Sequence, residues 1–239
     1  MEKLHLGIDI GGWKIRGILW DGWRVVRAAE IPTPRTKAAF IRNVQQLMGK
    51  LAGWTGTPVR GIGIAAAGRC SGTRVLSSTN IPYLRDFDFR TLRQRATFRV
   101  GNDAQAFARA EATLGAGRKA RRMLALTIGT GIGRAYAERG RVRIMKQFEH
   151  AEPWEREYQR IRDRGDTRAL ASFLGKRLAA IARRYKPDTI VLGGGVLGRR
   201  GLTERLKAEF AAHGLTANVH RGRLGPNAAA IGAALLFSA

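Results

Sequence analysis

The fold of this chain is decided by residues 6–20, which read L-G-I-D-I-G-G-W-K-I-R-G-I-L-W. An apolar, strand-forming run carries one carboxylate, Asp9, and reaches Gly11 and Gly12, after which apolar residues return at alternate positions. This pattern predicts a two-stranded hairpin with a glycine turn at its tip. Such a turn can approach a bulky ligand closely and offer its N–H groups to phosphate oxygens. Asp9 could hold a magnesium ion, directly or through water; the alternative is an ordinary hairpin with a surface Asp.

Length and composition predict a globular protein. The 239 residues, 44% of them hydrophobic, can bury one large core or two modest ones. No apolar run approaches the roughly 20 residues of a membrane helix, and no signal peptide precedes the first predicted strand. We therefore expect a cytoplasmic protein with no membrane partner. The single cysteine, Cys70, excludes an intrachain disulfide and a multi-cysteine zinc site.

Net charge is the unusual property of the chain. The 43 Lys and Arg residues outnumber the 18 Asp and Glu residues and give +25. A field this positive should attract polyanions such as nucleic acid, polyphosphate or a nucleotide. The even scatter of arginines also fits a compositional bias spread over every solvated face. Because no helix-turn-helix, zinc finger or aromatic RNA-binding pattern occurs, we expect no specific nucleic-acid partner.

The first half of the chain is predicted to form a three-stranded meander followed by an α/β segment. Strands are expected at residues 4–10, 14–20, 23–30, 59–66 and 97–100, and helices at 37–51, 89–95 and 104–114. The dipeptide Asp21-Gly22 is a strong signal for the second hairpin turn. A further carboxylate, Asp103, stands where a strand gives way to a helix, which is the open end of an α/β sheet.

The second half begins by repeating the first. Residues 124–133 read L-A-L-T-I-G-T-G-I-G, and the order of strand, glycine turn, strand, tight turn and strand returns with the same glycine spacing. Asp9 then corresponds to Thr127. The repeat predicts two similar lobes that each present a phosphate loop to one cleft. The remaining predicted elements are helices at 167–185, 201–213 and 226–237 and a strand at 189–192 that ends in three glycines.

Eight motifs follow one another over residues 6–236: I-D-I-G-G-x-K, G-I-A-A-A-G, T-N-I-P, G-N-D-A-Q-A, L-T-I-G-T-G-I-G, F-E-H, V-L-G-G-G-V and N-A-A-A-I-G-A-A-L. In this order they resemble the ROK family of sugar kinases, which belongs to the actin and hexokinase superfamily. The small size and the lack of the family's zinc-binding cysteines make the chain more similar to the polyphosphate glucokinase branch than to longer members.

The resemblance implies the fold and the domain organisation. It predicts an α/β protein with a two-lobed, actin-like ATPase (ribonuclease H-like) fold, a duplicated β-meander phosphate motif and an interlobe cleft. The small N-terminal lobe would comprise residues 1–104 and the C-terminal helix 226–239, and the larger C-terminal lobe residues 105–225. The resemblance also suggests a homodimer.

The same resemblance implies a kinase that transfers a phosphoryl group from ATP or inorganic polyphosphate to a hexose hydroxyl, as a glucokinase does. Asp103 would be the general base that accepts the proton of the sugar hydroxyl, and Asp9 would help to hold Mg²⁺ through water. The implied phosphate- and nucleotide-binding residues are Asp9, Gly11, Gly12, Lys14, Thr127, Gly129, Thr130, Gly131, Gly193, Gly194 and Gly195. The implied sugar-binding residues are Asn80, Asn102, Asp103, Gln147, His150 and Glu155.

Several of these residues have a structural alternative. Asp103 could be merely the N-cap of the following helix, a common use of Asp. His150 could be an ordinary hydrogen-bonding histidine, and Asn80 before Ile81-Pro82 is a good turn residue in any protein.

Three positions depart from the family pattern. Trp13 replaces the small hydroxyl residue of the first phosphate motif, and Gln147 and Glu149 replace a glutamate and a glycine of the sugar motif. We expect the indole of Trp13 to turn aside and leave the backbone N–H groups to bind phosphate. The departures motivate a second hypothesis, that the chain is a catalytically impaired family member that binds sugar or a polyanion as a sensor or scaffold.

Overall fold

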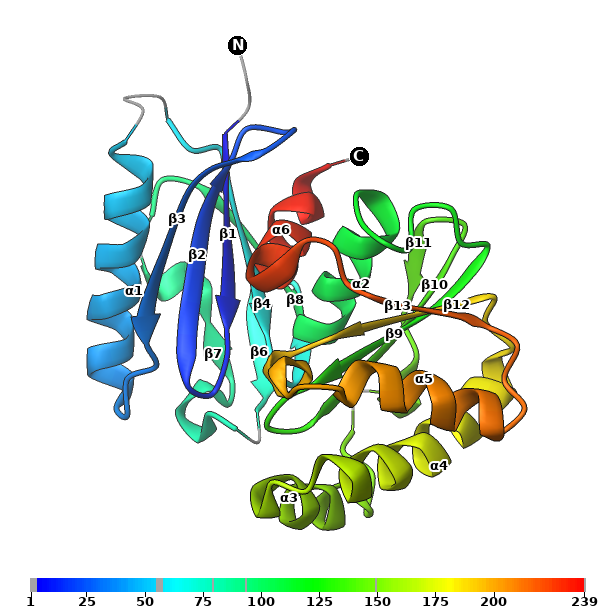
Figure 1. Cartoon of the computed structure of the whole chain (residues 1–239). Helices are drawn as coiled ribbons and strands as arrows, with labels where there is room; N and C mark the ends of the chain where they lie inside the picture. The colour runs from blue at the N-terminus through cyan, green and yellow to red at the C-terminus, as the bar shows by residue number, and fades with distance from the viewer. Residues whose placement is uncertain (1–3, 55–57, 79, 93, 149, 239) are drawn as a thin grey trace. The chain divides into compact units, whose positions relative to one another are not determined.

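The computed structural model describes residues 4–54, 58–78, 80–92, 94–148 and 150–238, and all of their side chains except that of Lys146. Two motif residues, Thr79 and Glu149, lie outside the described residues. The chain divides into two compact units, Met1–Ala110 with Pro226–Ala239, and Glu111–Gly225. Each unit has its own five-stranded sheet and its own hydrophobic core (Figure 1).

The sheet of the first unit has the strand order β3-β2-β1-β4-β8. Its strands are β1 (His5–Ile10), β2 (Lys14–Trp20), β3 (Val25–Pro32), β4 (Gly61–Ala66) and β8 (Thr97–Asn102). β1, β2 and β3 form the predicted antiparallel meander, and β4 and β8 run parallel to β1. β3 begins two residues later than predicted because the Asp21 carboxylate accepts hydrogen bonds from the amides of Trp23 and Arg24, both at 2.8 Å.

Helix α1 (Lys37–Ala52) packs against this sheet. It begins at the N-cap Thr36, whose side chain accepts from the amide of Ala39. Its buried residues follow the predicted helical spacing: Phe40, Val44, Leu47, Met48 and Leu51. The predicted helix over 89–95 is only a 3₁₀ turn, Phe89–Leu92.

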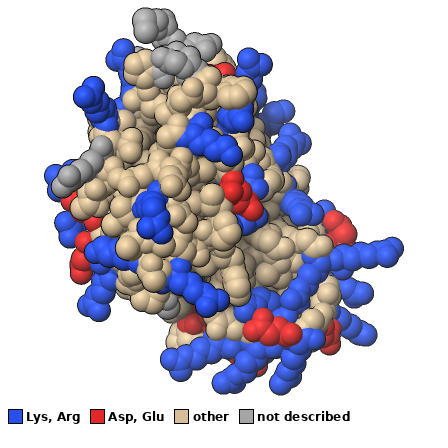
Figure 2. Space-filling view, turned by 90° about the vertical axis from the view of Figure 1, so that its left-hand side faces the viewer, with Lys and Arg blue, Asp and Glu red and all other residues tan. Residues whose placement is uncertain are grey.

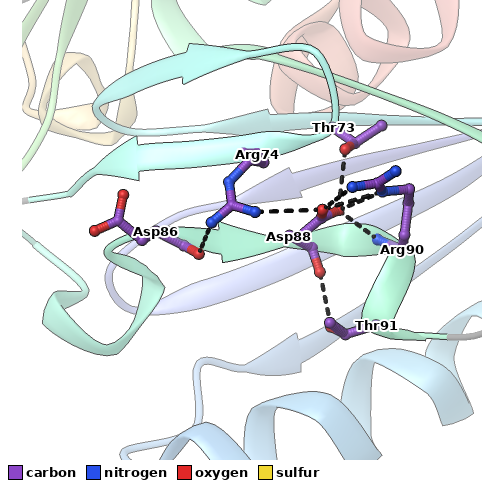
Figure 3. Close-up of polar contacts among 6 residues, drawn as sticks. All are labelled: Thr73, Arg74, Asp86, Asp88, Arg90 and Thr91. Carbon is purple, nitrogen blue, oxygen red and sulfur yellow. Dashed lines mark hydrogen bonds and ion pairs between the residues drawn. The ribbon is translucent and has the colours of Figure 1, made fainter.

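A small three-stranded sheet in the first unit was not predicted. It contains β5 (Arg69–Ser71), β6 (Arg74–Ser77) and β7 (Phe87–Asp88). Figure 3 shows Asp88 at its centre, where its carboxylate accepts from Thr73 at 3.0 Å, from Arg74 at 3.5 Å and from the guanidinium of Arg90 at 2.6 Å. The backbone oxygen of Asp88 accepts from Thr91 at 2.7 Å. One carboxylate therefore fastens β7 to the β5–β6 hairpin.

The C-terminal helix α6 (Ala228–Ala234) packs directly on the backbones of β1 and β4. A Cβ atom at Gly7 or at Gly63 would lie 1.9 Å from a backbone oxygen of α6, so only glycine allows this approach. Helix α2 (Asp103–Thr113) also contacts α6, because a Cβ at Gly232 would lie 1.7 Å from the Ala106 oxygen. This packing places residues 105–110 with the first unit, whereas the sequence placed them in the second lobe.

The second unit repeats this topology with the strand order β11-β10-β9-β12-β13. Its strands are β9 (Arg122–Ile128), β10 (Ile132–Glu138), β11 (Arg141–Arg143), β12 (Thr189–Gly193) and β13 (Asn218–Arg221). β9, β10 and β11 are antiparallel, and β12 and β13 run parallel to β9. The duplicated meander is thus confirmed. Asp9 and Thr127 each precede the last paired residue of the first strand of their hairpin, so they correspond as predicted.

Three helices complete the second unit: α3 (Glu155–Arg164), α4 (Thr167–Tyr185) and α5 (Leu202–Ala212). Helix α3 was not predicted, because charged residues dominate its sequence. Its acidic first turn and basic last turn suit the helix dipole, it ends at Gly165 with φ 82°, and the ring of Tyr158 is fully buried. Among the described residues, no helix combines the length and apolarity needed to cross a membrane.

Candidate active site

Two carboxylates of the first unit, Asp9 and Asp103, lie at the carboxyl ends of parallel strands. Asp9 is the next-to-last residue of β1, and Asp103 follows β8 as the first residue of α2. Burial and the neighbouring Asp103 raise the pKa of Asp9 from 3.8 to about 7, against a smaller opposite effect of Arg16 and Lys14. Burial likewise raises the pKa of Asp103. The two acids are therefore neighbours that oppose each other's ionisation.

Asp103 is not the N-cap of α2. That role falls to Asn102, whose side-chain oxygen accepts from the amide of Gln105 at 3.1 Å while its amide nitrogen donates to the Gly68 oxygen at 3.1 Å. The Asp103 carboxylate accepts from the adjacent Ala104 amide at 2.9 Å. Asn102, and not Asp103, therefore has the structural role of N-cap. The side chain of Asn102 is engaged within the protein.

The turn between β1 and β2 exposes backbone N–H groups. The Gly11 amide donates to the Lys14 oxygen at 3.0 Å, and Thr33 donates to the oxygens of Gly11 and Trp13. The amides of Gly12 and Trp13 find no acceptor in the described part of the chain. Neither glycine has a positive φ, and a Cβ at Gly12 would come no closer than 3.7 Å to another side chain. A Cβ at Gly11 would lie 3.1 Å from the Lys14 oxygen, so this tight turn favours glycine at position 11. Gly12 leaves open backbone that an anion can approach.

Three other predicted residues surround this turn. Trp13 is 83% exposed, so its indole does not pack on the glycines. The Lys14 ammonium lies 3.1 Å from the Glu30 carboxylate on β3. Asn80 is exposed, and its Cβ is the nearest side-chain atom to a Cβ built on Gly12. The first unit thus gathers Asp9, Asp103, Asn80 and the first glycine turn at one edge of its sheet.

The equivalent turn of the second unit is held by α3. Tyr158 donates its hydroxyl to the Gly129 oxygen at 2.5 Å, and Arg162 donates to the Thr130 oxygen at 2.7 Å. These bonds direct the turn's carbonyl groups toward α3. The amides of Thr130 and Gly131 have no acceptor among the residues that the structure describes. They are free to donate to an anion, as are the two amides of the first turn.

The glycines after β12 lie beside this second turn. Gly193 pairs with Thr127 in the parallel register of β12 and β9. Gly194 has φ 96°, and a Cβ there would lie 2.3 Å from the Ile128 oxygen, so this position requires glycine. A Cβ at Gly195 would meet nothing within 4 Å. The predicted phosphate- and nucleotide-binding residues of the second half therefore share one sheet edge.

The predicted sugar residues of the second unit differ in their surroundings. Gln147 is exposed and donates to the hydroxyl of Tyr185. His150 is exposed, and its backbone oxygen accepts from Arg134 at 2.6 Å. Glu155 is 6% exposed, and both of its carboxylate oxygens accept hydrogen bonds from residues of its own unit. Of the three, His150 has the side chain most available to a ligand.

The sequence interpretation missed the residues that hold the second turn, namely Arg134, Tyr158 and Arg162. One signal could have revealed part of this set. Tyr158 and Arg162 are four residues apart and so lie on one face of a helix. A buried Arg134 had no such signal, because arginines are scattered along the whole sequence.

Asp9 and Asp103 fit a magnesium ion. In the described chain no residue donates a hydrogen bond to the Asp9 carboxylate, although Asp9 is only partly exposed. A divalent cation would offset both the burial and the mutual repulsion of the pair. Mg²⁺ is commonly bound by one or two carboxylates together with phosphates and water. No cluster of three or more His, Cys, Asp or Glu residues occurs among the described residues.

Comparison with known proteins identifies relatives of the chain. A family model described as "ROK family" matches residues 5–147. A glucokinase of Streptomyces coelicolor is 30% identical over 139 residues, which cover 54% of this chain and 42% of that protein. A polyphosphate glucokinase of Mycobacterium leprae is 28% identical over 211 residues, 80% of this chain and 63% of the relative. The matched regions thus span only part of these curated relatives.

Solved structures match the chain over nearly its full length. The inorganic polyphosphate/ATP-glucomannokinase of Arthrobacter sp. strain KM has a TM-score of 0.83 and 25% identity, and the match covers 98% of both chains. A ROK hexokinase of Thermus thermophilus has a TM-score of 0.76 and 25% identity over 97% of both chains. The fold is therefore the actin-like ATPase fold of ROK sugar kinases.

Proposed function

Because the chain belongs to the ROK family, we propose that it is a sugar kinase that transfers a phosphoryl group from ATP or inorganic polyphosphate to a hexose hydroxyl. The observation that carries the proposal is the pair Asp9 and Asp103. At neutral pH, two neighbouring carboxylates with raised pKa values lower the stability of the fold. Such a costly pair is typical of a functional site, and a kinase needs carboxylates for proton transfer and metal binding.

Asp103 acts as the general base. Burial moves the pKa of Asp103 toward neutral pH. A base with a pKa near the working pH is partly ionised and also accepts a proton readily. It takes the proton of the sugar hydroxyl as that oxygen attacks the terminal phosphoryl group, and the bond from phosphorus to the donor's bridging oxygen breaks. Asp9 holds Mg²⁺, which when bound neutralises phosphate charge.

The free amides bind the donor's phosphate oxygens. The first unit supplies those of Gly12 and Trp13, and the second those of Thr130 and Gly131. Backbone donors recognise phosphate without reading a base, so they serve a nucleotide and a polyphosphate alike. The names of two relatives include polyphosphate, which supports the second donor. Gly193, Gly194 and Gly195 border the adenine if the donor is ATP.

The acceptor is a hexose such as glucose. Asn80, Asp103 and His150 are the predicted sugar residues whose side chains are available for contact, whereas Asn102 and Glu155 are engaged inside the protein. A homodimer remains a prediction of the resemblance, and a cytoplasmic location remains a prediction from the sequence composition.

A coupled assay with a panel of hexoses, run with ATP and with polyphosphate, tests the proposal. Asp103→Asn should lower kcat by about 10²- to 10⁴-fold, the usual contribution of a positioned base. Asp86→Asn is the matched control, because the carboxylate of this exposed Asp lies 4.0 Å from Arg85 and the substitution leaves the bond from Arg74 to its backbone oxygen in place. Full activity of Asp103→Asn, or no turnover of any hexose with either donor, would refute the assignment.

A second function is motivated by Trp13 and Gln147, which depart from the family pattern. Gln147 is also bonded to Tyr185, so its amide is engaged by another residue of the protein. A catalytically impaired protein would bind sugar or polyanion as a sensor or scaffold. It would show ligand-dependent thermal stabilisation without turnover.

A further inference from the structure

A buried arginine in the second unit, Arg134 on β10, joins two segments that matter for the proposed function. Only 1% of its side chain is exposed. One terminal nitrogen, Nη2, donates to the His150 oxygen at 2.6 Å and to the Glu155 carboxylate at 3.0 Å. The other, Nη1, lies 3.6 Å from the Glu152 carboxylate. A single guanidinium thus reaches the segment that carries His150 and the first residue of α3.

Glu155 extends this connection to the phosphate turn. Its Oε2 accepts from the Ile132 amide at 3.1 Å, immediately after Gly131, and its Oε1 accepts from the Glu152 amide at 2.9 Å. A Cβ at Gly131 would lie 3.3 Å from Oε2, so the carboxylate packs directly against the turn. The pair Arg134–Glu155 therefore connects both segments through buried, charge-assisted hydrogen bonds.

Stability alone gives a poor account of this pair. Desolvation of two charges offsets most of their attraction, and apolar residues of similar volume often serve the core as well. Two nitrogens of Arg134, Nε and Nη1, are buried and have no hydrogen bond to any residue that the structure describes, which adds a further cost. What the pair supplies is a directional connection between backbone segments, which apolar packing cannot supply.

We propose that Arg134 and Glu155 are positioning residues that hold the phosphate turn Gly129–Gly131 and the sugar segment at His150 in one fixed geometry. The proposal rests on the proposed function for the roles of those two segments. The hydrogen bonds that Arg134 and Glu155 form all go to groups of the protein, so the proposed role is to position other residues. Loosening the pair moves both segments, so sugar and phosphoryl donor are each bound less well, while the chemical groups themselves are intact.

The decisive variant replaces the pair by apolar residues, Arg134→Met with Glu155→Leu, so that no buried charge is left alone. Its thermal midpoint should stay within a few degrees of the parent, whereas KM for glucose and KM for polyphosphate should each rise about 10-fold with a smaller change in kcat. Hydrogen exchange should increase in the peptides that span 129–132 and 147–152. Native KM values and native exchange in this stably folded variant would overturn the proposal.

Glu111→Gln is the matched control. Glu111 is also fully buried and accepts from three backbone amides, those of Ala116, Arg223 and Leu224. The Glu111→Gln variant should be less stable than the parent, but both KM values and the hydrogen exchange of the two peptides should be unchanged. A joint rise of both KM values in this control would show that any destabilisation of the unit has the same effect, and the proposal would fail.

If the apolar variant does not fold, Arg134→Lys takes its place. It keeps a charge opposite Glu155 but lacks the planar fork that reaches two acceptors. It should raise both KM values and the exchange of both peptides, and unchanged values would overturn the proposal. If the parent turns over no hexose, the proposed function fails, and the exchange of the two peptides still decides whether the pair joins them.

Discussion

Asp9 is a residue whose position folding alone does not explain. The nearest cation, Arg16 on the neighbouring strand, is directed elsewhere, to Glu30 at 2.5 Å and to Asn227 at 3.1 Å. Asp9 therefore stays partly buried beside Asp103, and none of the described residues forms an ion pair with it. A carboxylate kept in this state is available to a ligand, which is the arrangement expected for a cation site.

The raised pKa of Asp9 predicts how stability depends on pH. Between its ordinary value of 3.8 and its folded value of about 7, the folded protein binds more protons than the unfolded chain. The free energy of unfolding should therefore fall as pH rises through this range, by on the order of 1–3 kcal/mol. Asp9→Asn should flatten the fall and be the more stable protein at neutral pH.

Urea unfolding of parent and variant at several pH values, without magnesium, measures this effect. Part of the slope should remain in Asp9→Asn, because the pKa of Asp103 is raised by burial as well. The exposed Asp86→Asn should keep the parent's slope. Parallel curves for the parent and Asp9→Asn would contradict the prediction.

Among the elements, the small sheet depends on one carboxylate. Asp88 accepts from Thr73, Arg74 and Arg90 (Figure 3), and the Arg90 hydrogen bonds hold the pKa of its carboxyl well below the usual range. The same hairpin carries Gly68, whose oxygen receives the side-chain amide of Asn102. Fastening β7 to the hairpin thereby supports the residue that caps α2.

Asp88→Asn should destabilise the protein by about 1–3 kcal/mol at neutral pH, because charge-assisted hydrogen bonds are lost. The lowered pKa means that the stabilisation is complete above the unfolded pKa and disappears as pH falls toward the folded pKa. The difference between parent and variant should therefore shrink below about pH 4. Urea unfolding at neutral and acid pH measures it, and an unchanged difference would argue against the ionic contribution.

The contact of α6 with the first sheet predicts the most severe single substitution. Gly63→Ala would place a methyl group against the backbone of α6, which cannot yield as a flexible side chain can. It should prevent stable folding or lower the thermal midpoint by well over 10 °C, as expected for a loss of several kcal/mol.

Gly49→Ala is the control for this substitution. Gly49 lies within α1, a Cβ there would meet nothing within 4 Å, and its φ is not positive. This variant should be stabilised by about 0.5–1 kcal/mol, since alanine favours the helix. Similar melting temperatures for the two variants would show that α6 does not pack as described.

At the scale of the whole molecule, charge is the dominant property. The net charge is +25, and Figure 2 shows a face on which Lys and Arg side chains far outnumber Asp and Glu. A large positive charge attracts any polyanion and does not by itself define a binding site. In the proposed function, specific phosphate binding is therefore assigned to the backbone amides of the two glycine turns.

Because the net charge attracts polyanions but not neutral sugars, the KM values of the two substrates should depend differently on salt. Raising the salt concentration from about 50 to about 500 mM shortens the screening length from roughly 14 to 4 Å. KM for polyphosphate should rise at least about 10-fold, whereas KM for a neutral hexose should change less than about 2-fold. Steady-state kinetics at several salt concentrations measures both, and an equal rise would indicate a general effect of salt on the enzyme.

Local pattern was enough to predict the two hairpins, their glycine turns, their repetition and the carboxylates at strand ends. These features follow from alternation, turn chemistry and spacing, which act over a few residues. Helix α3 was missed because its tertiary anchor, the buried Tyr158, outweighs a strongly polar sequence. The alternative that Asp103 caps α2 was wrong, because Asn102, held by the Gly68 oxygen, provides the cap.

The sequence by itself determined the two antiparallel meanders and the positions of Asp9, Asp103 and the glycine turns. It did not predict strand β13, whose sequence Asn-Val-His-Arg is short and polar, or the order of the parallel strands. Only the tertiary structure decided which of these groups are free. It engages Asn102 and Glu155 inside the protein, leaves the amides of both turns open and buries Arg134 between two segments of one unit. The physical reason is that a residue's partners are brought from distant parts of the chain, and desolvation makes every buried polar group depend on them.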